Sequence, residues 1–310
     1  MIPKVAHFIW LGPSLAWVHR LALLSAARRG GFERVVLHHD GALGGEQAPR
    51  ELAEERGVEL SALDALGLME AAGGGPLVEC YRALEAPAAR ANLLRLALLR
   101  RDGGVYLDTD TVTLASFGGL SAEAGVFCGE ERLVFPAGES SALSRLRPSA
   151  LARMAARDVL RRLPNGYRGF RQVEHLYPKA VNNAVLGAEP GHPLVTELLA
   201  RARRMSPSRR TVRYALGTHL LQEVVADYSG KDLRILPPEV FFPFGPEISE
   251  HWFRERAGIE LGDALGPETL LVHWYASVRT KRHVERIDET FVRTHADRQL
   301  FSALALRALG

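Results

Sequence analysis

Cysteine is scarce in this chain of 310 residues, and long hydrophobic runs are missing altogether. The two cysteines, Cys80 and Cys128, lie far apart. The sequence therefore predicts neither a disulfide framework nor a cysteine-ligated metal, and each cysteine is expected to be a small buried side chain. No apolar stretch approaches the roughly 20 residues that cross a bilayer. The first residues lack the basic, apolar and small-residue order of a signal peptide, so we expect a soluble, cytoplasmic protein.

Charge of one sign is concentrated in a single segment, although the net charge is only +3. Residues 201–213 contain six arginines and no acid. Such a run is usually a solvated helix end, and this is the interpretation we favour. The alternative is a surface for an acidic acceptor or for peripheral contact with the inner face of a membrane. Nucleic-acid binding is excluded, because no aromatic interleaving or recognisable module accompanies the arginines.

The amino-terminal part alternates between patterns typical of strands and of helices. A strand is expected over residues 4–11, a helix from an N-cap at Ser14 to Arg29, a strand over 34–40 and a helix over 49–57. This order predicts an α/β fold with a mainly parallel central sheet. Further along, we expect helices over residues 149–163 and 192–205 and strands over 125–131, 233–237 and 269–275.

Two aspartates follow an apolar strand in the stretch GGVYLDTDTV. The preceding segment, residues 87–101, is rich in alanine, leucine and arginine and predicts a helix. Gly103 and Gly104 can supply the left-handed turn that ends it. Residues 105–107 then form a short buried strand, with Asp108 and Asp110 at its carboxyl end, where ligands bind in open α/β sheets.

The paired carboxylates allow three interpretations. They can hold Mg²⁺ or Mn²⁺ against a diphosphate, since hard cations take oxygen ligands and share substrate phosphates. They can be an ordinary polar strand end. They can also be the D-x-D-x-[TV] motif of a haloacid-dehalogenase-like phosphatase, with Asp108 as nucleophile and Asp263 and Glu268 as a distant acidic motif. A long α/β segment precedes this motif here, and the usual following glycine is absent, so the phosphatase is the weaker alternative.

Four segments together resemble a known family: IPKVAHFIWLG at the start, ANLLRLALLRRDGGVYLDTD, VNNAVLGAEPGHPL and VHWYAS near the end. They are similar to the DXD-containing sugar transferases, which are related to bacterial capsular polysaccharide glycosyltransferases, yeast initiating mannosyltransferases and the glucosyltransferase domain of large clostridial toxins. The resemblance implies a GT-A fold with a helical insertion. We expect one domain with a nucleotide-binding half (residues 1–135), a mainly helical acceptor-side insertion (136–230) and a closing segment (231–310).

The resemblance also implies roles for individual residues. Asp110 would bind the metal directly, and Asp108 would bind it through water or hold the ribose. Two residues of the closing segment, His273 and Ser277, would complete the metal shell or touch phosphate. The nucleotide-sugar donor would be held by Trp10, Asn92, Arg95, Tyr106, Asn183 and Trp274.

The family pattern is broken at two positions. Asn92 stands where an aspartate is usual, and Val278 where a tryptophan is usual. These departures leave a catalytically silent sugar-nucleotide-binding module as an alternative. The favoured hypothesis is a metal-dependent transferase that retains anomeric configuration and uses a UDP-sugar rather than GDP-mannose. The acceptor stays open among polysaccharide, lipid-linked glycan, protein and small metabolite.

Overall fold

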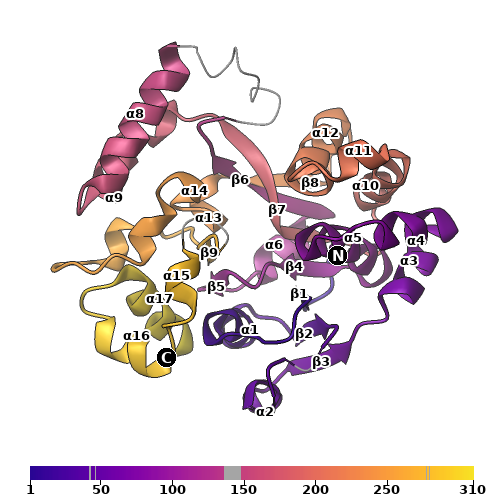
Figure 1. Cartoon of the computed structure of the whole chain (residues 1–310), viewed down its shortest axis with the longest axis horizontal. Helices are drawn as coiled ribbons and strands as arrows, with labels where there is room; N and C mark the ends of the chain where they lie inside the picture. Colours follow the sequence, from indigo (N-terminus) through magenta and orange to yellow (C-terminus); the bar gives the residue numbers. More distant parts are fainter. Residues whose placement is uncertain (42, 46, 136–147, 277, 279) are drawn as a thin grey trace.

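A seven-stranded sheet forms the centre of the molecule in a computed structural model that describes residues 1–41, 43–45, 47–135, 148–276, 278 and 280–310 (Figure 1). The strand order is β3-β2-β1-β4-β7-β6-β8. Four of the six neighbouring pairs are parallel, and only the two pairs that contain β7 are antiparallel. The expected mainly parallel α/β sheet is thereby confirmed. The strands are β1 (Val5–Trp10), β2 (Arg34–His39), β3 (Val58–Ala62), β4 (Gly104–Leu107), β6 (Val126–Arg132), β7 (Lys179–Ala188) and β8 (Leu233–Leu236).

Helices surround this sheet, and three buried clusters of apolar side chains lie between the layers. Helix α5 buries the whole run Leu93–Leu99, because it is enclosed by the sheet on one side and by other helices on the other. Each fully buried leucine of this kind contributes about 1.5–3 kcal/mol. The helices are α1 (Trp17–Arg29), α2 (Gln47–Glu54), α3 (Ala65–Gly73), α4 (Gly75–Arg82), α5 (Pro87–Asp102), α6 (Gly118–Glu123), α8 (Pro148–Arg162), α9 (Gly166–Val173), α10 (Pro193–Arg204), α11 (Pro207–Arg210), α12 (Leu220–Asp227), α13 (Pro238–Phe241), α14 (Gly245–Ile248), α15 (Lys281–Val284), α16 (Glu289–His295) and α17 (Leu300–Leu309).

The turn from α5 into β4 depends on glycine, as the sequence predicts. Gly103 and Gly104 have φ angles of 65° and 95°. A Cβ at Gly104 would lie 2.6 Å from the carbonyl oxygen of Val5 on the neighbouring strand. Only glycine adopts this backbone without strain, so the pair directs the chain abruptly from the helix into the central strand.

A second, two-stranded sheet joins distant parts of the chain. Strand β5 (Thr111–Thr113) pairs antiparallel with β9 (Leu271–His273), and Thr111 lies opposite His273. The residues directly after the two aspartates are therefore fixed against the carboxyl-terminal part of the chain.

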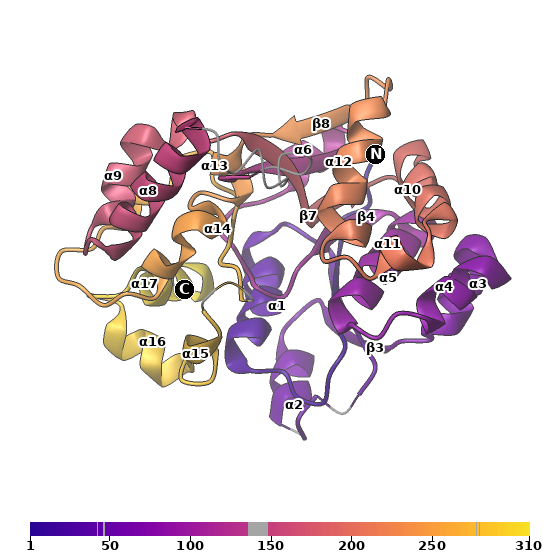
Figure 2. The ribbon, with the colours of Figure 1, turned by 45° about the horizontal axis from the view of Figure 1, so that its top comes forward.

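Several local expectations need correction. Helix α1 begins at Trp17 after Ala16, so Ser14 is not its N-cap. Strand β9 covers only three residues of the expected 269–275 strand. The stretch 136–230 includes the ten-residue strand β7 of the central sheet. Helices α8 and α9 lie at the end of the molecule opposite α3 and α4, whereas α10 to α12 lie on the other side of β7 (Figures 1 and 2). The division into three functional segments stays a prediction.

The arginine-rich segment lies on α10, α11 and the following loop. Arg201 pairs with Glu197 and Asp227, and Arg204 and Arg209 pair with Glu197 and Glu223. Half of the six arginines are thus neutralised within the chain, in agreement with a solvated surface. Membrane contact through residues 201–213 stays a prediction. None of the helices in the described part of the chain combines the length and hydrophobicity that crossing a bilayer requires.

Both cysteines are buried and free, as expected. Burial raises the pKa of the Cys128 thiol to about 12, which removes thiolate reactivity.

Candidate functional site

A cavity of about 700 Å³ opens at the edge of the central sheet where β1 and β4 end and β7 begins. Helix α5 and the loop after β9 complete its wall. Eight of the ten site residues predicted from the sequence line this cavity, although they come from five separate parts of the chain. They are Trp10, Asn92, Arg95, Tyr106, Asp108, Asp110, Asn183 and His273.

Two side chains hold Asp108 in place. The Arg95 guanidinium nitrogen Nη2 lies 3.0 Å from Oδ1 of Asp108, and the Tyr106 hydroxyl donates to the same oxygen at 2.8 Å. Arg95 also lies over the Tyr106 ring, 4.2 Å from its centroid, and donates to the carbonyl oxygen of Asn183. The expectation that Tyr106 and Asp108 point the same way on one strand agrees with this geometry.

Asp110 is bound to the closing segment rather than to α5. Nε2 of His273 lies 3.0 Å from Oδ1 of Asp110, and the backbone N–H of Ala276 donates to Oδ2 at 2.8 Å. The backbone N–H of Trp274 donates to the Asp110 carbonyl at 3.0 Å. Asp110 therefore fixes the course of the chain from residue 273 to residue 276.

These contacts shift the pKa values of the Asp108 and Asp110 carboxyl groups in opposite directions. Burial and the adjacent Asp110 charge raise the pKa of Asp108, although Arg95 opposes them. Burial also acts to raise the pKa of Asp110, but His273 and the Ala276 N–H outweigh it and lower the value to about 2. Asp110 is thus the carboxylate that stays ionised most readily.

The same three residues form a group that could hold a divalent cation. One ligand atom each from Asp108, Asp110 and His273 lies within 4.8 Å of the others. The Nδ1 atom of His273 is buried and has no hydrogen-bond partner in the described chain. Two carboxylates and an imidazole suit Mn²⁺ or Mg²⁺, which take oxygen ligands and leave positions for phosphate. The residues present therefore fit the expected metal.

Two amides face each other beside this group. Nδ2 of Asn183 donates to Oδ1 of Asn92 at 2.9 Å, which joins β7 to α5. Gly217, in η2 (Ala215–His219), lies so close that a Cβ there would be 3.0 Å from the Asn92 amide nitrogen and 3.1 Å from that of Asn183. Both asparagines thus lie in the cavity wall. On β7 the sequence favours Asn183 over its neighbour Asn182 as the residue that faces the ligand, and both line the cavity.

The indole of Trp10 also lines the cavity. Its ring lies 4.7 Å from the His19 ring, centroid to centroid, and its Nε1 has no partner among the described residues. The Nδ1 atom of His19 lies 3.0 Å from the carbonyl oxygen of Thr109, between the aspartates. His19 was not predicted, because it lies on α1 with no motif around it.

One predicted residue of the described chain, Trp274, is not brought into the cavity. Trp274 is completely buried in the third apolar cluster, beside Phe253 and Phe301, and does not line the cavity. Its side chain alternates with those of His273 and Tyr275, so it points into the core, and the expected donor contact is not supported. Ser277 lies outside the described residues.

The cavity wall also contains polar residues that the sequence did not indicate, among them Glu131 and Tyr275. Glu131 lies near the end of β6, Asn182 precedes Asn183 on β7, and Tyr275 follows the β9 strand. The Tyr275 hydroxyl donates to Oε2 of Glu131 at 2.8 Å, and the Asn182 side chain bonds to the same carboxyl group. Burial raises the pKa of Glu131. The alternation of β6 could have placed Glu131 on an inner face, but nothing in its sequence indicated a cavity.

The acidic motif of the phosphatase hypothesis is not assembled. Asp263 pairs with Arg168 at 2.6 Å, and neither Asp263 nor Glu268 belongs to the residues that line the cavity around Asp108. Residues 261–263 form a short helical turn rather than a strand. The described structure therefore offers no second acidic pair for phosphoaspartyl chemistry.

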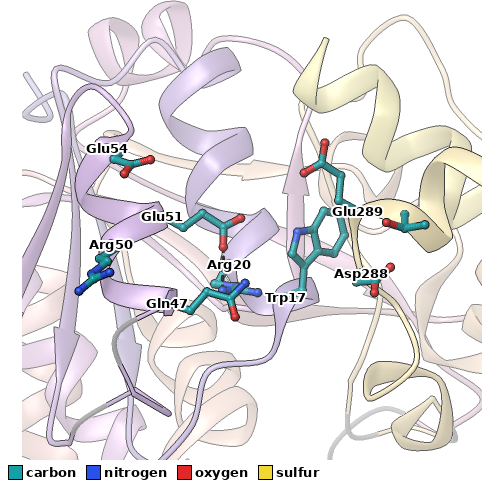
Figure 3. A pocket seen from close by; sticks show the side chains of 9 residues that line it. Trp17, Arg20, Gln47, Arg50, Glu51, Glu54, Asp288 and Glu289 are labelled. Carbon is teal, nitrogen blue, oxygen red and sulfur yellow. Dashed lines mark ion pairs between the residues drawn. The ribbon is translucent and has the colours of Figure 1, made fainter.

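A smaller cavity of about 510 Å³ lies between α1, α2 and α16 (Figure 3). Arg20 and Glu51 pair across it at 2.7 Å, and Trp17 lies beside them, toward Glu289 and Asp288. None of the predicted site residues reaches this cavity.

Comparison with known proteins agrees with the geometry. Residues 56–126 match the family described as "Glycosyltransferase sugar-binding region containing DXD motif". That segment contains α5, β4 and both aspartates. No curated protein sequence is significantly similar to the chain.

Solved glycosyltransferase structures are similar to the chain at low sequence identity. WbbM, a bifunctional glycosyltransferase, is 14% identical with a TM-score of 0.50, and the match covers 100% of this chain and 52% of that one. Mouse xyloside xylosyltransferase 1 is 15% identical, with coverage of 88% and 98% and a TM-score of 0.48. The PaToxG glycosyltransferase is 17% identical, with coverage of 73% and 69% and a TM-score of 0.46. The segment with both aspartates is thus similar to a DXD-containing glycosyltransferase family, and the chain shares its α/β fold with a glycosyltransferase of known structure.

Proposed function

We propose that this protein transfers a sugar from a nucleotide-sugar, with a UDP-sugar favoured, to an acceptor hydroxyl and that it requires Mn²⁺ or Mg²⁺. The observation that carries the proposal is the convergence of Asp108, Asp110 and His273 in one cavity with Arg95 and the Asn92–Asn183 pair. Cation ligands, a guanidinium and amides side by side suit a diphosphate joined to a polyol.

The cavity lining contains a group suited to each part of such a donor. The Trp10 indole at the end of β1 offers an aromatic face for a nucleobase. The Asp108–Asp110–His273 group suits the diphosphate, and the Asn92–Asn183 amides suit sugar hydroxyls. The preference for uridine over guanosine rests on the family resemblance, and the same holds for retention of configuration.

The residues that would hold the cation are Asp110 and His273, with Asp108 directly or through water. When bound, Mn²⁺ or Mg²⁺ neutralises the diphosphate and makes it a better leaving group. Arg95 keeps Asp108 oriented and adds a positive charge within the same wall. The Ala276 N–H bond to Asp110 places the closing segment over the same point.

The acceptor is a hydroxyl compound of open identity, which includes polysaccharide, lipid-linked glycan, protein and small metabolite. A cytoplasmic location and a role in polysaccharide synthesis remain expectations from the sequence. A catalytically silent binding module is the second candidate, because Asn92 replaces an aspartate and Val278 a tryptophan of the family pattern.

The test is a panel of UDP- and GDP-sugars incubated with the protein and Mn²⁺, with release of free nucleoside diphosphate as readout. We expect release from at least one UDP-sugar, and Mn²⁺-dependent UDP binding by calorimetry. Binding without release from any donor would favour the silent module. Absence of both would refute the proposal.

A further inference from the structure

Glu131 is a buried carboxyl group that the proposed function does not use. It is 5% exposed, and the exposed part faces the cavity from the end of β6. No lysine or arginine of the described chain forms an ion pair with it, whereas its neighbour Glu130 pairs with Lys179 at 3.6 Å. A buried carboxyl that forms no ion pair with lysine or arginine is costly, so its retention in a cavity wall points to a ligand.

Two neutral groups hold this carboxyl in position. The Tyr275 hydroxyl donates to Oε2 at 2.8 Å, and the Asn182 side chain is the second partner. The Oδ1 atom of Asn182 already accepts from the backbone N–H of Ala184 at 2.7 Å, so its amide nitrogen is the group that faces Glu131. Tyr275 reaches Glu131 with a φ of 60°, a strained backbone conformation that is common at functional sites.

Asn182 and Asn183 divide the cavity into two polar walls. Adjacent residues of a strand point to opposite faces, and these two bond to different elements. Asn183 joins Asn92 of α5, on the wall assigned to the donor. Asn182 joins Glu131 of β6, on a second wall. The ring of His273 lies 4.1 Å from that of Tyr275, so the second wall adjoins one of the cation ligands.

The second wall has the chemistry of a hydroxyl-binding subsite. A carboxylate has about four acceptor positions, and the two internal donors leave the others for a ligand. Sugars carry many hydroxyl donors. Among the described residues that line the cavity, Glu131 is the one buried carboxyl outside the cation group that can accept from them.

We propose that Glu131 accepts a hydrogen bond from a sugar hydroxyl, of either the donor sugar or the acceptor, on the side of the cation group away from Asn92. This inference rests on the proposed function and adds a contact to it. Tyr275 and Asn182 are positioning residues, since they act through Glu131.

The experiment compares Glu131→Gln with the matched control Glu130→Gln, which makes the same change on the adjacent, outward-facing residue. Calorimetry with Mn²⁺ measures the dissociation constants of UDP and of UDP-glucose, UDP-galactose and UDP-N-acetylglucosamine. A second assay measures UDP release from each sugar in water alone and with added methyl glycosides of glucose, galactose and mannose. Thermal unfolding checks that both variants are folded.

We expect Glu131→Gln to leave UDP binding unchanged. Either the affinity for UDP-sugars or the glycoside-stimulated rate of UDP release should fall by about 10- to 100-fold, because a hydrogen bond to a charged group is lost. A loss in UDP-sugar affinity relative to UDP assigns Glu131 to the donor sugar. Loss of the glycoside-stimulated rate alone assigns it to the acceptor. Glu130→Gln should match the wild type in every measurement.

The inference would be overturned if Glu131→Gln bound each UDP-sugar and released UDP, with and without glycosides, as the wild type does. In that case the proposed function would still stand, provided that the wild type binds UDP. Absence of UDP binding in the wild type would overturn both. If Glu131→Gln does not fold, Tyr275→Phe serves instead: it keeps the carboxyl and removes one internal donor. A smaller loss of the same kind is expected there, and no change would count against the inference.

Discussion

Arg95 and Asp108 form an ion pair at the junction of α5 and β4, with Nη2 and Oδ1 3.0 Å apart and the arginine side chain only 6% exposed. The same guanidinium donates to the Asn183 carbonyl and lies over the Tyr106 ring. One side chain thus connects the helix before the aspartates, the strand that carries them and the strand that carries the amide pair.

Arg95→Lys should therefore reduce activity strongly while keeping the charge. A lysine ammonium is a point charge. It cannot reproduce the planar arginine guanidinium, which forms two directed hydrogen bonds and stacks on an aromatic ring. We expect UDP release to fall by about 100-fold, as for loss of one oriented charge in an active site. The measurement is the steady-state rate of UDP release.

The matched control for this change is Arg101→Lys on the same helix. Arg101 is exposed and pairs with the adjacent Asp102 at 2.7 Å. Exposed pairs contribute only about 0–1 kcal/mol, so this variant should keep the wild-type rate and unfolding temperature. Equal losses in both variants would mean that Arg95 has no special role.

Asp110→Asn should abolish the metal dependence of UDP binding. The substitution removes a carboxylate from the cation group and weakens the contact to His273. Calorimetry should show Mn²⁺-stimulated UDP binding in the wild type and none in the variant. Addition of EDTA should reduce the wild type to the same level.

Asp263→Asn is the control for that experiment. Asp263 is exposed and pairs with Arg168, remote from the cavity lining. It is also the acid that the phosphatase hypothesis would require. Wild-type behaviour of this variant supports the cation site at Asp110, whereas a loss of turnover equal to that of Asp110→Asn would revive the phosphatase.

Short-range patterns predicted the elements that position the aspartates. The α5 helix, the Gly103–Gly104 turn and β4 all follow from residue preferences that act within a few positions. The central strand β7 was not predicted as a strand, because its sequence is small and polar and its pairing with β4 and β6 is decided by distant partners.

The site was predictable where a motif placed two groups on one element, as for Asp108 and Asp110. The second wall was not predictable, since Glu131 and Tyr275 are 144 residues apart and meet only through the fold. Trp274 was misplaced for a related reason: strand alternation assigns it to the face opposite His273, and only the packing of α17 shows that this face is core.

The buried histidines His7 and His38 should make stability depend on pH. Nδ1 of His7 lies 3.0 Å from Nε2 of His38, so one ring must be neutral to accept the bond. Burial, followed by the proximity of His7, lowers the pKa of His38 to about 3. In the unfolded chain the value is about 6.5.

The direction of the pH dependence follows from this difference between the folded and unfolded pKa values. Between about pH 6.5 and pH 3, His38 binds a proton in the unfolded chain but not in the folded protein. The free energy of unfolding is therefore highest above this window and decreases as the pH falls through it. The slope should approach about 1.4 kcal/mol per pH unit for this one group. Urea unfolding at several pH values measures it. His38→Gln should flatten the slope, and His295→Gln, at a less buried position, should not.

Gly217 sets the position of the Asn92–Asn183 amide pair, and its substitution should weaken donor binding. A Cβ at this position would lie 3.0–3.2 Å from atoms of the two amides, so Gly217→Ala must move them by a few tenths of an ångström. Displacement of oriented polar groups typically costs about tenfold in affinity or more. We expect that loss for UDP-sugars and a smaller one for UDP, since the proposed function assigns the amides to the sugar.

Gly119→Ala on α6 is the matched control for this last prediction, because a Cβ there meets no atom within 4 Å. Calorimetry with UDP and UDP-sugars in Mn²⁺ should separate the two variants, with wild-type constants for Gly119→Ala. An equal loss of affinity for UDP and for UDP-sugars in Gly217→Ala would place the amide pair against the nucleotide instead of the sugar. Unchanged affinity for both ligands would remove the amide pair from the donor site altogether.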